Sequence, residues 1–189
     1  MAKQSWKPGN MLYPVPAVLV SARDKEGNDN LLTIAWVGTV CSDPAMLSIS
    51  VRKERYTHHM LKESGEFVVN LTTKKLLTAT DYCGVRSGRD EDKFATMQLT
   101  KGEAEKINAP IIMESPVNIE CKVTQVLELG SHDMFLAEVV NVQVSDELLD
   151  EKGTFRLQDA DLLAYSHGEY YELGEKLGTF GFSVKKSKK

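Results

Sequence analysis

The chain has 189 residues, 42% of them hydrophobic, and a formal net charge of −4, which together predict one ordinary globular domain over residues 1–189. Four of its 23 Lys and Arg residues lie among the last five positions, so 27 acidic residues oppose only 19 basic ones in the rest of the chain. An acidic body is repelled by phosphate backbones, and this composition argues against nucleic acid as a partner.

The N-terminal half of the chain is predicted to supply four strands. These are apolar runs rich in Val, Ile and Leu, and a turn-rich segment at 24–29 separates the first two. The predicted strands cover residues 15–22, 30–40, 46–51 and 66–71.

Two short helices are predicted around the last of these strands. The first covers residues 57–64, with Thr57 as its N-cap and Gly65 just past its end. The second covers residues 73–82, because its apolar side chains fall on one helical face, and it is expected to end at Cys83.

The most regular segment is 117–129, where apolar and polar residues alternate as in a strand with one buried face. After a turn at 130–133, an apolar run resumes over 134–144, so the two runs predict a long hairpin. Thirteen residues at about 3.3 Å each give a strand of roughly 43 Å, and so long a ribbon tends to curl. We therefore predict a mainly β (α+β) fold, a β-barrel with short helices inserted between strands.

The location of the protein in the cell and the presence of a metal site are predicted from motifs that the sequence lacks. No stretch approaches the roughly 18 apolar residues of a membrane span, and the N-terminus has no apolar core of a signal peptide. Three cysteines without a C-x-x-C spacing are typical of reduced thiols. We expect a cytoplasmic protein with no membrane association and no metal site, and a flexible basic tail at 184–189.

Two loops carry features of anion binding. Residues 50–57 run from a strand end into a helix start and contain Arg52, Lys53 and Arg55, where cations would add to the helix N-terminus. Residues 83–94 add two glycines, a serine and further cations. From composition alone, both are better interpreted as ordinary solvated loops.

Several segments in chain order resemble the flavin reductase-like, FMN-binding split-barrel family, and its flavoredoxin and ferric-reductase-like branch in particular. These segments are NLLTIAW at 30–36, CSDP at 41–44, SISVR at 48–52, YTH at 56–58, FVVNL at 67–71, YCG at 82–84, DKF at 92–94 and LGSH at 129–132. An ordered set of motifs over most of the chain is more specific than any one of them.

The resemblance implies that FMN lies at the rim of a split barrel and carries the chemistry, so no side chain is expected to act as a nucleophile. It places the phosphate and ribityl chain near Ser50, Arg52, Lys53, Thr57, Ser87 and Gly88, and it also implies that Val51 contacts the cofactor. It places the isoalloxazine ring near Asn30, Ala35, Trp36, Lys93, His132 and Tyr165. Lys93 and His132 are the candidates for tuning the reduction potential of the ring.

Each of these assignments has a competing interpretation. Trp36 is by default a core aromatic residue, and Lys93 a solvated surface cation. Asn30 and His132 belong to predicted turns, where both residue types are common for backbone reasons alone.

The resemblance further implies a homodimer and an oxidoreductase that passes electrons from NAD(P)H through FMN to a small acceptor, namely free flavin, ferric iron or a redox protein. One alternative is a flavoredoxin-type FMN electron carrier without significant NAD(P)H oxidation of its own. Another is a non-redox barrel that binds some other phosphate-bearing ligand. Five of the 14 aromatic residues lie in the last 25 positions, so we expect residues 167–174 to dock on the barrel or on a partner subunit.

Overall fold

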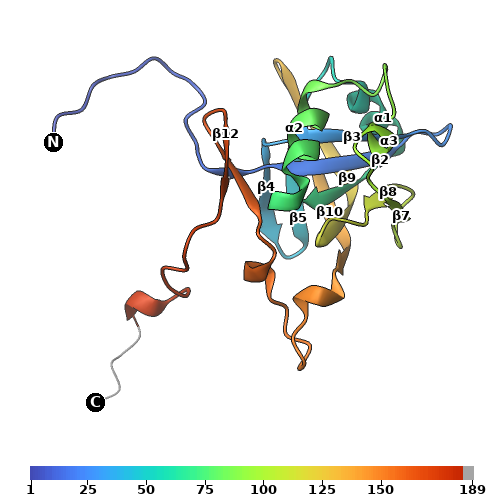
Figure 1. The fold of residues 1–189 in the computed structure, drawn as a ribbon. Coiled ribbons are helices and arrows are strands. Elements are labelled where there is room, and N and C mark those ends of the chain that lie inside the picture. Colours follow the sequence, from blue (N-terminus) through green and yellow to red (C-terminus); the bar gives the residue numbers. More distant parts are fainter. Residues whose placement is uncertain (185–189) are drawn as a thin grey trace.

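A curled antiparallel sheet of seven strands forms the body of the protein, with short helices against it (Figure 1). The computed structural model describes residues 1–184, so the predicted basic tail lies outside the described residues except for its first position. The sheet order is β3-β2-β6-β9-β10-β5-β4. The strands are β2 (Val18–Arg23), β3 (Asp29–Ile34), β4 (Val37–Ser42), β5 (Ala45–Arg52), β6 (Glu66–Leu71), β9 (Val117–Leu129) and β10 (His132–Val144). The mainly β prediction is confirmed.

The barrel is split between β3 and β4, which are consecutive in sequence but lie at opposite edges of the sheet. Only Ala35 and Trp36 join them, so the sheet must curl until its two edges come together at this link. No ladder joins these two strands in the described part of the chain. Trp36 is instead tied to β5, since its carbonyl oxygen accepts a hydrogen bond from the Ser50 amide at 2.9 Å. The prediction of a single strand over residues 30–40 is therefore wrong, because the chain passes from one edge of the sheet to the other within this segment.

The first helix, α1 (Tyr56–Ser64), joins β5 to β6 and ends as predicted. Gly65 adopts φ 68° and donates its amide hydrogen to the Leu61 carbonyl. The predicted N-cap is wrong, because Arg55 occupies that position and Thr57 lies inside the first turn, where it is buried. The hydroxyl of Thr57 is engaged by a residue of β3 rather than by an amide of its own helix.

The predicted second helix, residues 73–82, is a 3₁₀ turn, η1 (Lys74–Leu76), followed by α2 (Leu77–Val85). The helix continues past Cys83 to Val85, and Gly84 lets it approach β3 closely: a β-carbon there would lie 3.3 Å from Cβ of Thr33. A third helix, α3 (Lys93–Thr96), was not predicted, and Asp92 caps it by accepting from the Phe94 amide at 2.9 Å. The second predicted loop is thus partly helical.

The long hairpin of β9 and β10 is confirmed, and β9 has the predicted bounds. β10 starts earlier than predicted, at His132, because the turn has only two residues, Gly130 at φ 51° and Ser131. A small hairpin of β7 (Lys101–Glu103) and β8 (Pro110–Ile112) was not predicted.

Both faces of β2 are covered, which explains its continuous apolar run. Val18 and Val20 belong to the core inside the curled sheet, together with Phe67 and Phe135. Leu19 faces the other way, into the cluster under α2 and α3.

A separate three-stranded sheet holds the C-terminal part against the start of the barrel. Its strands are β1 (Val15–Pro16), β11 (Leu163–Ser166) and β12 (Glu169–Glu172), in the order β1-β11-β12. The predicted docking of residues 167–174 is confirmed for Tyr170, which is half-buried, whereas Tyr171 is exposed. Three further 3₁₀ turns, η2 (Asp146–Leu148), η3 (Leu157–Asp159) and η4 (Phe182–Val184), complete the described elements.

Two chain ends leave the body as extended arms (Figure 1). The arms comprise residues 1–12 and 173–184, and nearly every residue in them is exposed. Among the described residues, no helix is long and apolar enough to cross a membrane.

Candidate functional site

Two adjoining cavities lie where the barrel is split. The larger, which we call the aromatic cavity, has a volume of about 560 Å³, and its wall includes Tyr13, Trp36, Arg52, His132, Tyr165 and Tyr170. The smaller, which we call the cationic cavity, has a volume of about 260 Å³, and its wall includes Asn30, Thr57, Arg86, Ser87, Arg89 and Lys93. Leu32 and Arg55 line both, so the two cavities adjoin each other across these two side chains.

Most of the sequence-predicted site residues line these cavities, but they are grouped differently from the prediction. The aromatic cavity contains Ala35, Trp36, Ser50, Val51, Arg52, His132 and Tyr165. The cationic cavity contains Asn30, Thr57, Ser87, Gly88 and Lys93. Ser50 and Arg52, which were assigned to the phosphate and ribityl chain, thus lie with the residues assigned to the ring. Asn30 and Lys93 lie with Thr57.

Lys53 stands apart from the predicted site, because it is not among the residues that line either cavity. Its ammonium nitrogen lies 3.3 Å from Oδ1 of Asp133 and 3.8 Å from Oε2 of Glu128. Its charge is therefore directed to carboxylates on the β9–β10 hairpin.

Lys93 is a buried cation at the start of α3, with only 3% of its surface exposed. Its ammonium group donates hydrogen bonds to the carbonyl oxygens of Cys83 and Arg86, both at 3.3 Å, at the C-terminal end of α2. Burial lowers the pKa of Lys93, and the nearby charge of Arg55 lowers it further, whereas Cys83 and Glu91 act in the opposite direction without cancelling the effect of burial. Within the described chain no carboxylate lies within ion-pair distance of this ammonium group, so a buried positive charge in the cavity wall has no negative partner.

Three arginines add to the positive charge of the cationic cavity. The guanidinium of Arg89 lies over the Tyr56 ring at 5.8 Å, and that of Arg86 lies over the Tyr82 ring at 5.9 Å. Neither of these two, nor Arg55, forms an ion pair with any of the described residues. The first turn of α1 contains no acidic residue and has no side-chain cap, so its amide groups also favour an anion here.

Asn30 connects the walls of the cationic cavity. Its Nδ2 atom donates a hydrogen bond to the hydroxyl of Thr57 at 2.8 Å, and both side chains are buried. Gly88 lies against the other side of the same amide group, because a β-carbon on Gly88 would be 2.2 Å from its Oδ1 atom. Helix α1, strand β3 and the loop before α3 are therefore held together around one side chain.

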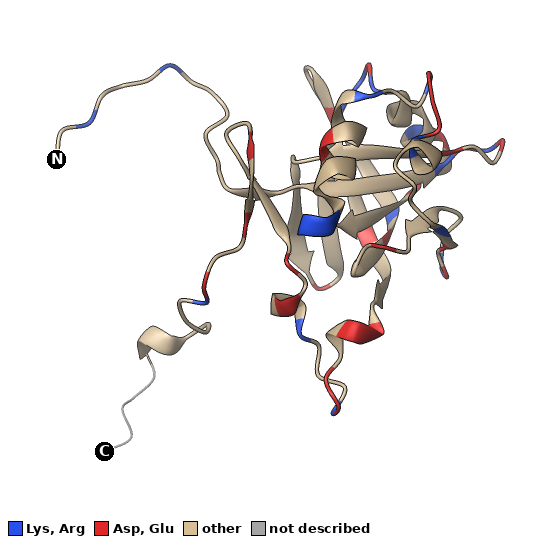
Figure 2. Ribbon diagram, in the orientation of Figure 1, with Lys and Arg blue, Asp and Glu red and all other residues tan. Residues whose placement is uncertain are grey.

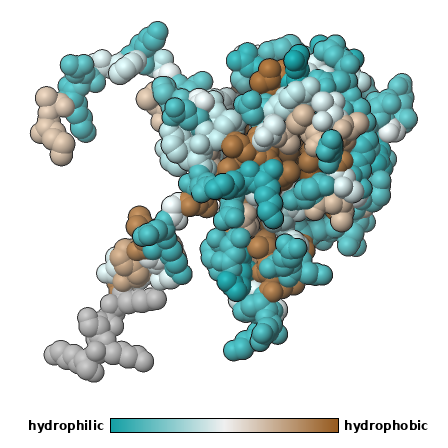
Figure 3. All heavy atoms as spheres, in the orientation of Figure 1, coloured by the Kyte–Doolittle hydropathy of each residue, from teal (hydrophilic) through white to brown (hydrophobic). Residues whose placement is uncertain are grey.

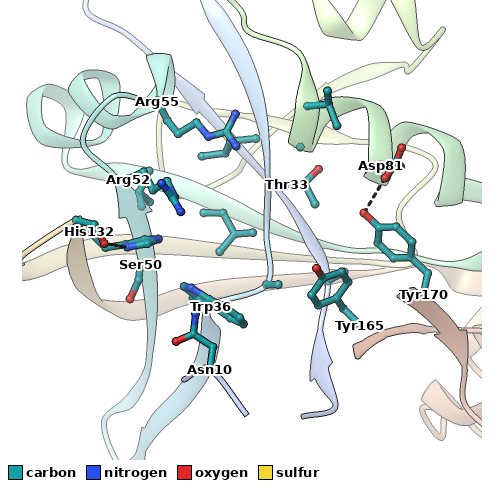
Figure 4. Close-up of a pocket in the computed structure, with 18 of the residues that line it drawn as sticks. Asn10, Thr33, Trp36, Ser50, Arg52, Arg55, Asp81, His132, Tyr165 and Tyr170 are labelled. Atoms are coloured by element: carbon teal, nitrogen blue, oxygen red, sulfur yellow. Dashed lines mark hydrogen bonds between the residues drawn. The ribbon is translucent and has the colours of Figure 1, made fainter. Parts of the chain in front are cut away.

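The aromatic cavity has two chemically different walls (Figure 4). Arg52, Arg55 and His132 lie on one side, and Tyr165 and Tyr170 lie on the other. Polar and charged groups thus face phenol rings across a space that suits a small planar molecule.

His132 presents a neutral imidazole to the aromatic cavity. Its Nδ1 atom lies 2.8 Å from the hydroxyl oxygen of Ser131, which leaves Nε2 as the ring nitrogen that can contact a ligand. Burial lowers the pKa of His132, and the positive charge of Arg52 lowers it further. Arg52 itself is paired with Glu54 at 3.3 Å.

Sequence reasoning missed several residues of the aromatic cavity, among them Asn10, Tyr13, Asp81 and Tyr170. Asn10 and Tyr13 precede the first strand, where no motif marked them, and Asp81 was one polar residue of a predicted helix. Tyr170 belonged to the aromatic C-terminal segment, whose unusual composition was the one available indication.

The two cavities together suit a ligand that combines a planar ring with an anionic tail. The buried, unpaired ammonium of Lys93 and the hydroxyls of Thr57 and Ser87 match the oxygens of a phosphate. The aromatic rings and the imidazole of His132 match a flat, polar heterocycle. The residues present therefore fit a flavin mononucleotide.

Comparison with known proteins agrees with this arrangement. The Flavin reductase like domain family matches residues 10–174. An uncharacterized protein of Archaeoglobus fulgidus is 37% identical over 142 residues, which cover 75% of this chain and 78% of that protein. A ferric-chelate reductase (NAD(P)H) of the same organism is 28% identical over 126 residues, 66% of each chain. The solved structure of flavoredoxin of Desulfovibrio vulgaris (Miyazaki F) aligns with a TM-score of 0.90 and 32% identity over 97% of this chain and 100% of that one. The chain belongs to the flavin reductase-like family, with the split-barrel fold of its members.

Proposed function

We propose that this protein is an FMN-dependent oxidoreductase that takes electrons from NAD(P)H and passes them to a small acceptor, namely free flavin, ferric iron or a redox protein. The observation that carries the proposal is the buried ammonium of Lys93, which has no carboxylate of the described chain within ion-pair distance and lies in a cavity that adjoins an aromatic one. Membership of the flavin reductase-like family and the similarity to a ferric-chelate reductase support it.

FMN, when bound, supplies the exchange of electrons in pairs or singly. The residues of this chain would bind and orient it. Lys93, Thr57 and Ser87 would hold the phosphate. Arg55 lines both cavities and would lie between the phosphate and the ring of FMN. Nε2 of His132 would contact the ring, where a polar group influences the reduction potential.

Titration with two flavins tests the cofactor. FMN and riboflavin share the ring, but riboflavin lacks the phosphate. We expect the purified protein to bind FMN with a flavin absorption spectrum and to bind riboflavin much more weakly. Lys93→Met should weaken FMN binding by about tenfold to a hundredfold, which is the loss of one hydrogen-bonded charge, and leave riboflavin binding nearly unchanged.

Lys75→Met is the matched control, since Lys75 is an exposed cation on η1 that lines neither cavity. Its FMN affinity should equal that of the wild type. A wild-type protein that binds no FMN, or binds unrelated phosphorylated ligands as well as FMN, would reject the proposal and favour a non-redox binding function.

The structural similarity to flavoredoxin favours a second candidate, an FMN electron carrier with little NAD(P)H oxidation of its own. Steady-state oxidation of NADH and NADPH by the FMN-loaded protein, with ferric citrate or free FMN as acceptor, separates the two. Oxidation of many molecules of NADH or NADPH per molecule of protein supports the reductase. Reduction by dithionite but not by either nicotinamide supports the carrier.

We further propose that the protein is a homodimer. The two arms (Figure 1) expose large apolar side chains, notably Trp6 on the N-terminal arm and Leu177 and Phe180 on the C-terminal arm. Figure 3 shows hydrophobic residues on the C-terminal arm. Exposed apolar residues on an extended segment are typical of an interface with another chain. Asn10 and Tyr13 connect the N-terminal arm to the aromatic cavity, so this interface would adjoin the flavin site.

A further inference from the structure

A buried pair of side chains connects helix α1 to strand β10 behind the candidate site. Nε2 of His58 lies 2.8 Å from Oδ2 of Asp133, and both residues are buried. The His58 ring also packs edge-on against the Phe135 ring of β10, with the two centroids 5.7 Å apart. One residue of α1 is therefore fixed to β10 by a polar contact and by an aromatic one.

Each member of this pair has a chain neighbour in the wall of the site. Thr57, next to His58, lines the cationic cavity, and His132, next to Asp133, lines the aromatic cavity. Successive residues of a strand point to opposite faces, so His132 faces the cavity (Figure 4) while Asp133 is buried on the other face of β10. The contact between His58 and Asp133 thus lies behind two residues that belong to different cavities.

Two lysines also approach Asp133, but they are held less firmly. The ammonium nitrogen of Lys62, on α1, lies 3.3 Å from Oδ2, and that of Lys53 lies 3.3 Å from Oδ1. Lys53 belongs to the short segment that joins β5 to α1, where charged residues of both signs follow one another (Figure 2). The side chains of Lys53 and Lys62 are 45% and 41% exposed, whereas that of His58 is 11% exposed. Of these three partners of Asp133, His58 therefore has the least freedom to move.

The position of α1 relative to β10 depends on side chains. The backbone of α1 lies against β2 and β3. Apolar side chains of α1 share the core with those of β10, but apolar packing has no preferred direction. A hydrogen bond is directional, so the buried contact between His58 and Asp133 limits how far α1 can shift relative to β10.

We propose that His58 is a positioning residue that holds Thr57 and His132 in one fixed relation, so that a single ligand contacts both cavities at once. FMN has a phosphate at one end and a ring at the other, and the gain from binding both ends depends on the geometry of the two contacts. Without the contact between His58 and Asp133, each cavity should keep its own residues but lose its alignment with the other. The inference rests on the proposed function in that FMN is the ligand that spans both cavities.

The ratio of the riboflavin Kd to the FMN Kd tests this positioning, because the two ligands differ only in the phosphate. His58→Leu keeps an apolar side chain against Phe135 and removes the contact with Asp133. We expect the ratio to fall by roughly fivefold or more, a small part of the 10²–10⁴ that two linked contacts supply. His58→Gln should restore the wild-type ratio, since its amide nitrogen can take the place of Nε2. Flavin fluorescence titration measures both dissociation constants.

A matched control separates a loss of stability from a loss of position. Val68 of β6 is fully buried in another apolar cluster, with Ile107 and Ile111, and it lines neither cavity. Val68→Ala should lower the free energy of unfolding and leave the ratio of the two dissociation constants unchanged. If His58→Leu does not fold, His58→Asn takes its place, because its shorter side chain does not reach Asp133.

The outcomes distinguish this inference from the proposed function. A wild-type ratio in His58→Leu, an equal fall in Val68→Ala, or no restoration in His58→Gln overturns the positioning role. A wild-type protein that binds no FMN rejects the proposed function, and hydrogen exchange in the flavin-free protein then still tests the contact. The backbone amides of α1 should exchange faster in His58→Leu than in the wild type or His58→Gln, and equal rates in all three overturn the inference.

Discussion

The backbone of Gly88 touches the side chain of Asn30 so closely that a β-carbon on Gly88 would lie 2.2 Å from the Oδ1 atom of Asn30. The Asn30 side chain cannot easily move away, because its Nδ2 atom donates a hydrogen bond to the hydroxyl of Thr57 at 2.8 Å. The loop that carries Gly88 therefore closes the cationic cavity only because this position has no side chain.

Gly88→Ala should accordingly move the loop away from Asn30. We expect the free energy of unfolding to fall by about 1–2 kcal/mol, as for other overpacked sites, and the dissociation constant for FMN to rise. Gly174→Ala is the control, since a β-carbon there meets no atom within 4 Å and the backbone is not in the left-handed region. Urea unfolding and FMN titration of the two variants measure both effects. Wild-type FMN affinity in Gly88→Ala would show that the cavity does not depend on this contact.

A second prediction concerns the imidazole of His132. Burial and the charge of Arg52 both hold its pKa below the ordinary value of 6.5. Arg52→Gln removes the second cause and leaves Glu54 without its partner, so the pKa of His132 should rise. The pH dependence of the histidine ring NMR signals measures it. Lys53→Gln should not change this pKa, because Lys53 faces Asp133; an equal rise in both variants would contradict the assignment.

The strands could be predicted from the sequence wherever alternation or an apolar run is decided locally, as over residues 117–129. The break at Trp36 could not, because it follows from closure of the whole sheet rather than from any local preference. Thr57 satisfies the local rule for an N-cap, but its hydroxyl is taken by Asn30, which lies 27 positions away in the chain. Long-range contacts decided both cases.

The candidate site was predictable only through an ordered set of motifs. Composition alone places Lys93 on the surface, and the structure buries it because α2 and α3 fold over its side chain and offer carbonyl partners. The aromatic wall of the larger cavity was not predictable, since Tyr13 and Tyr170 lie near opposite ends of the chain and line the same cavity only because the β1-β11-β12 sheet brings their segments together.

A third prediction concerns acid stability. Asp133 is fully buried between β10 and α1, with its Oδ2 atom 2.8 Å from Nε2 of His58 and 3.3 Å from the ammonium of Lys62. Burial alone would raise the pKa of Asp133, but the contact with His58 and the ammonium groups of Lys62 and Lys53 outweigh it and lower this pKa below 3.8. The ionised carboxylate therefore contributes its full stability above pH 3.8, and this contribution is lost as the pH falls through the folded-state pKa.

Asp133→Asn should lower the free energy of unfolding at pH 7 by about 1.5–3 kcal/mol, which is the range for a hydrogen bond to a charged group. The difference from the wild type should shrink as the pH is lowered below about 4, since only the wild-type residue then becomes protonated. Asp90→Asn, at an exposed position, should match the wild type across the range. Urea unfolding at several pH values measures all three proteins. A difference that stays constant with pH would rule out an ionised Asp133 as the cause.

The last prediction concerns the exposed C-terminal arm. Phe180 is fully exposed and Leu177 is 95% exposed, so neither can contribute much to the stability of an isolated chain. If the arm packs on a second copy, as proposed, these side chains become buried there and carry binding energy. Leu177→Ser together with Phe180→Ser should shift the protein from dimer to monomer in sedimentation velocity. Phe155→Ser, at a partly exposed loop position, is the control and should remain dimeric. A wild-type protein that sediments as a monomer would reject the homodimer, and a doubly substituted protein that remains a dimer would place its interface elsewhere than the arm.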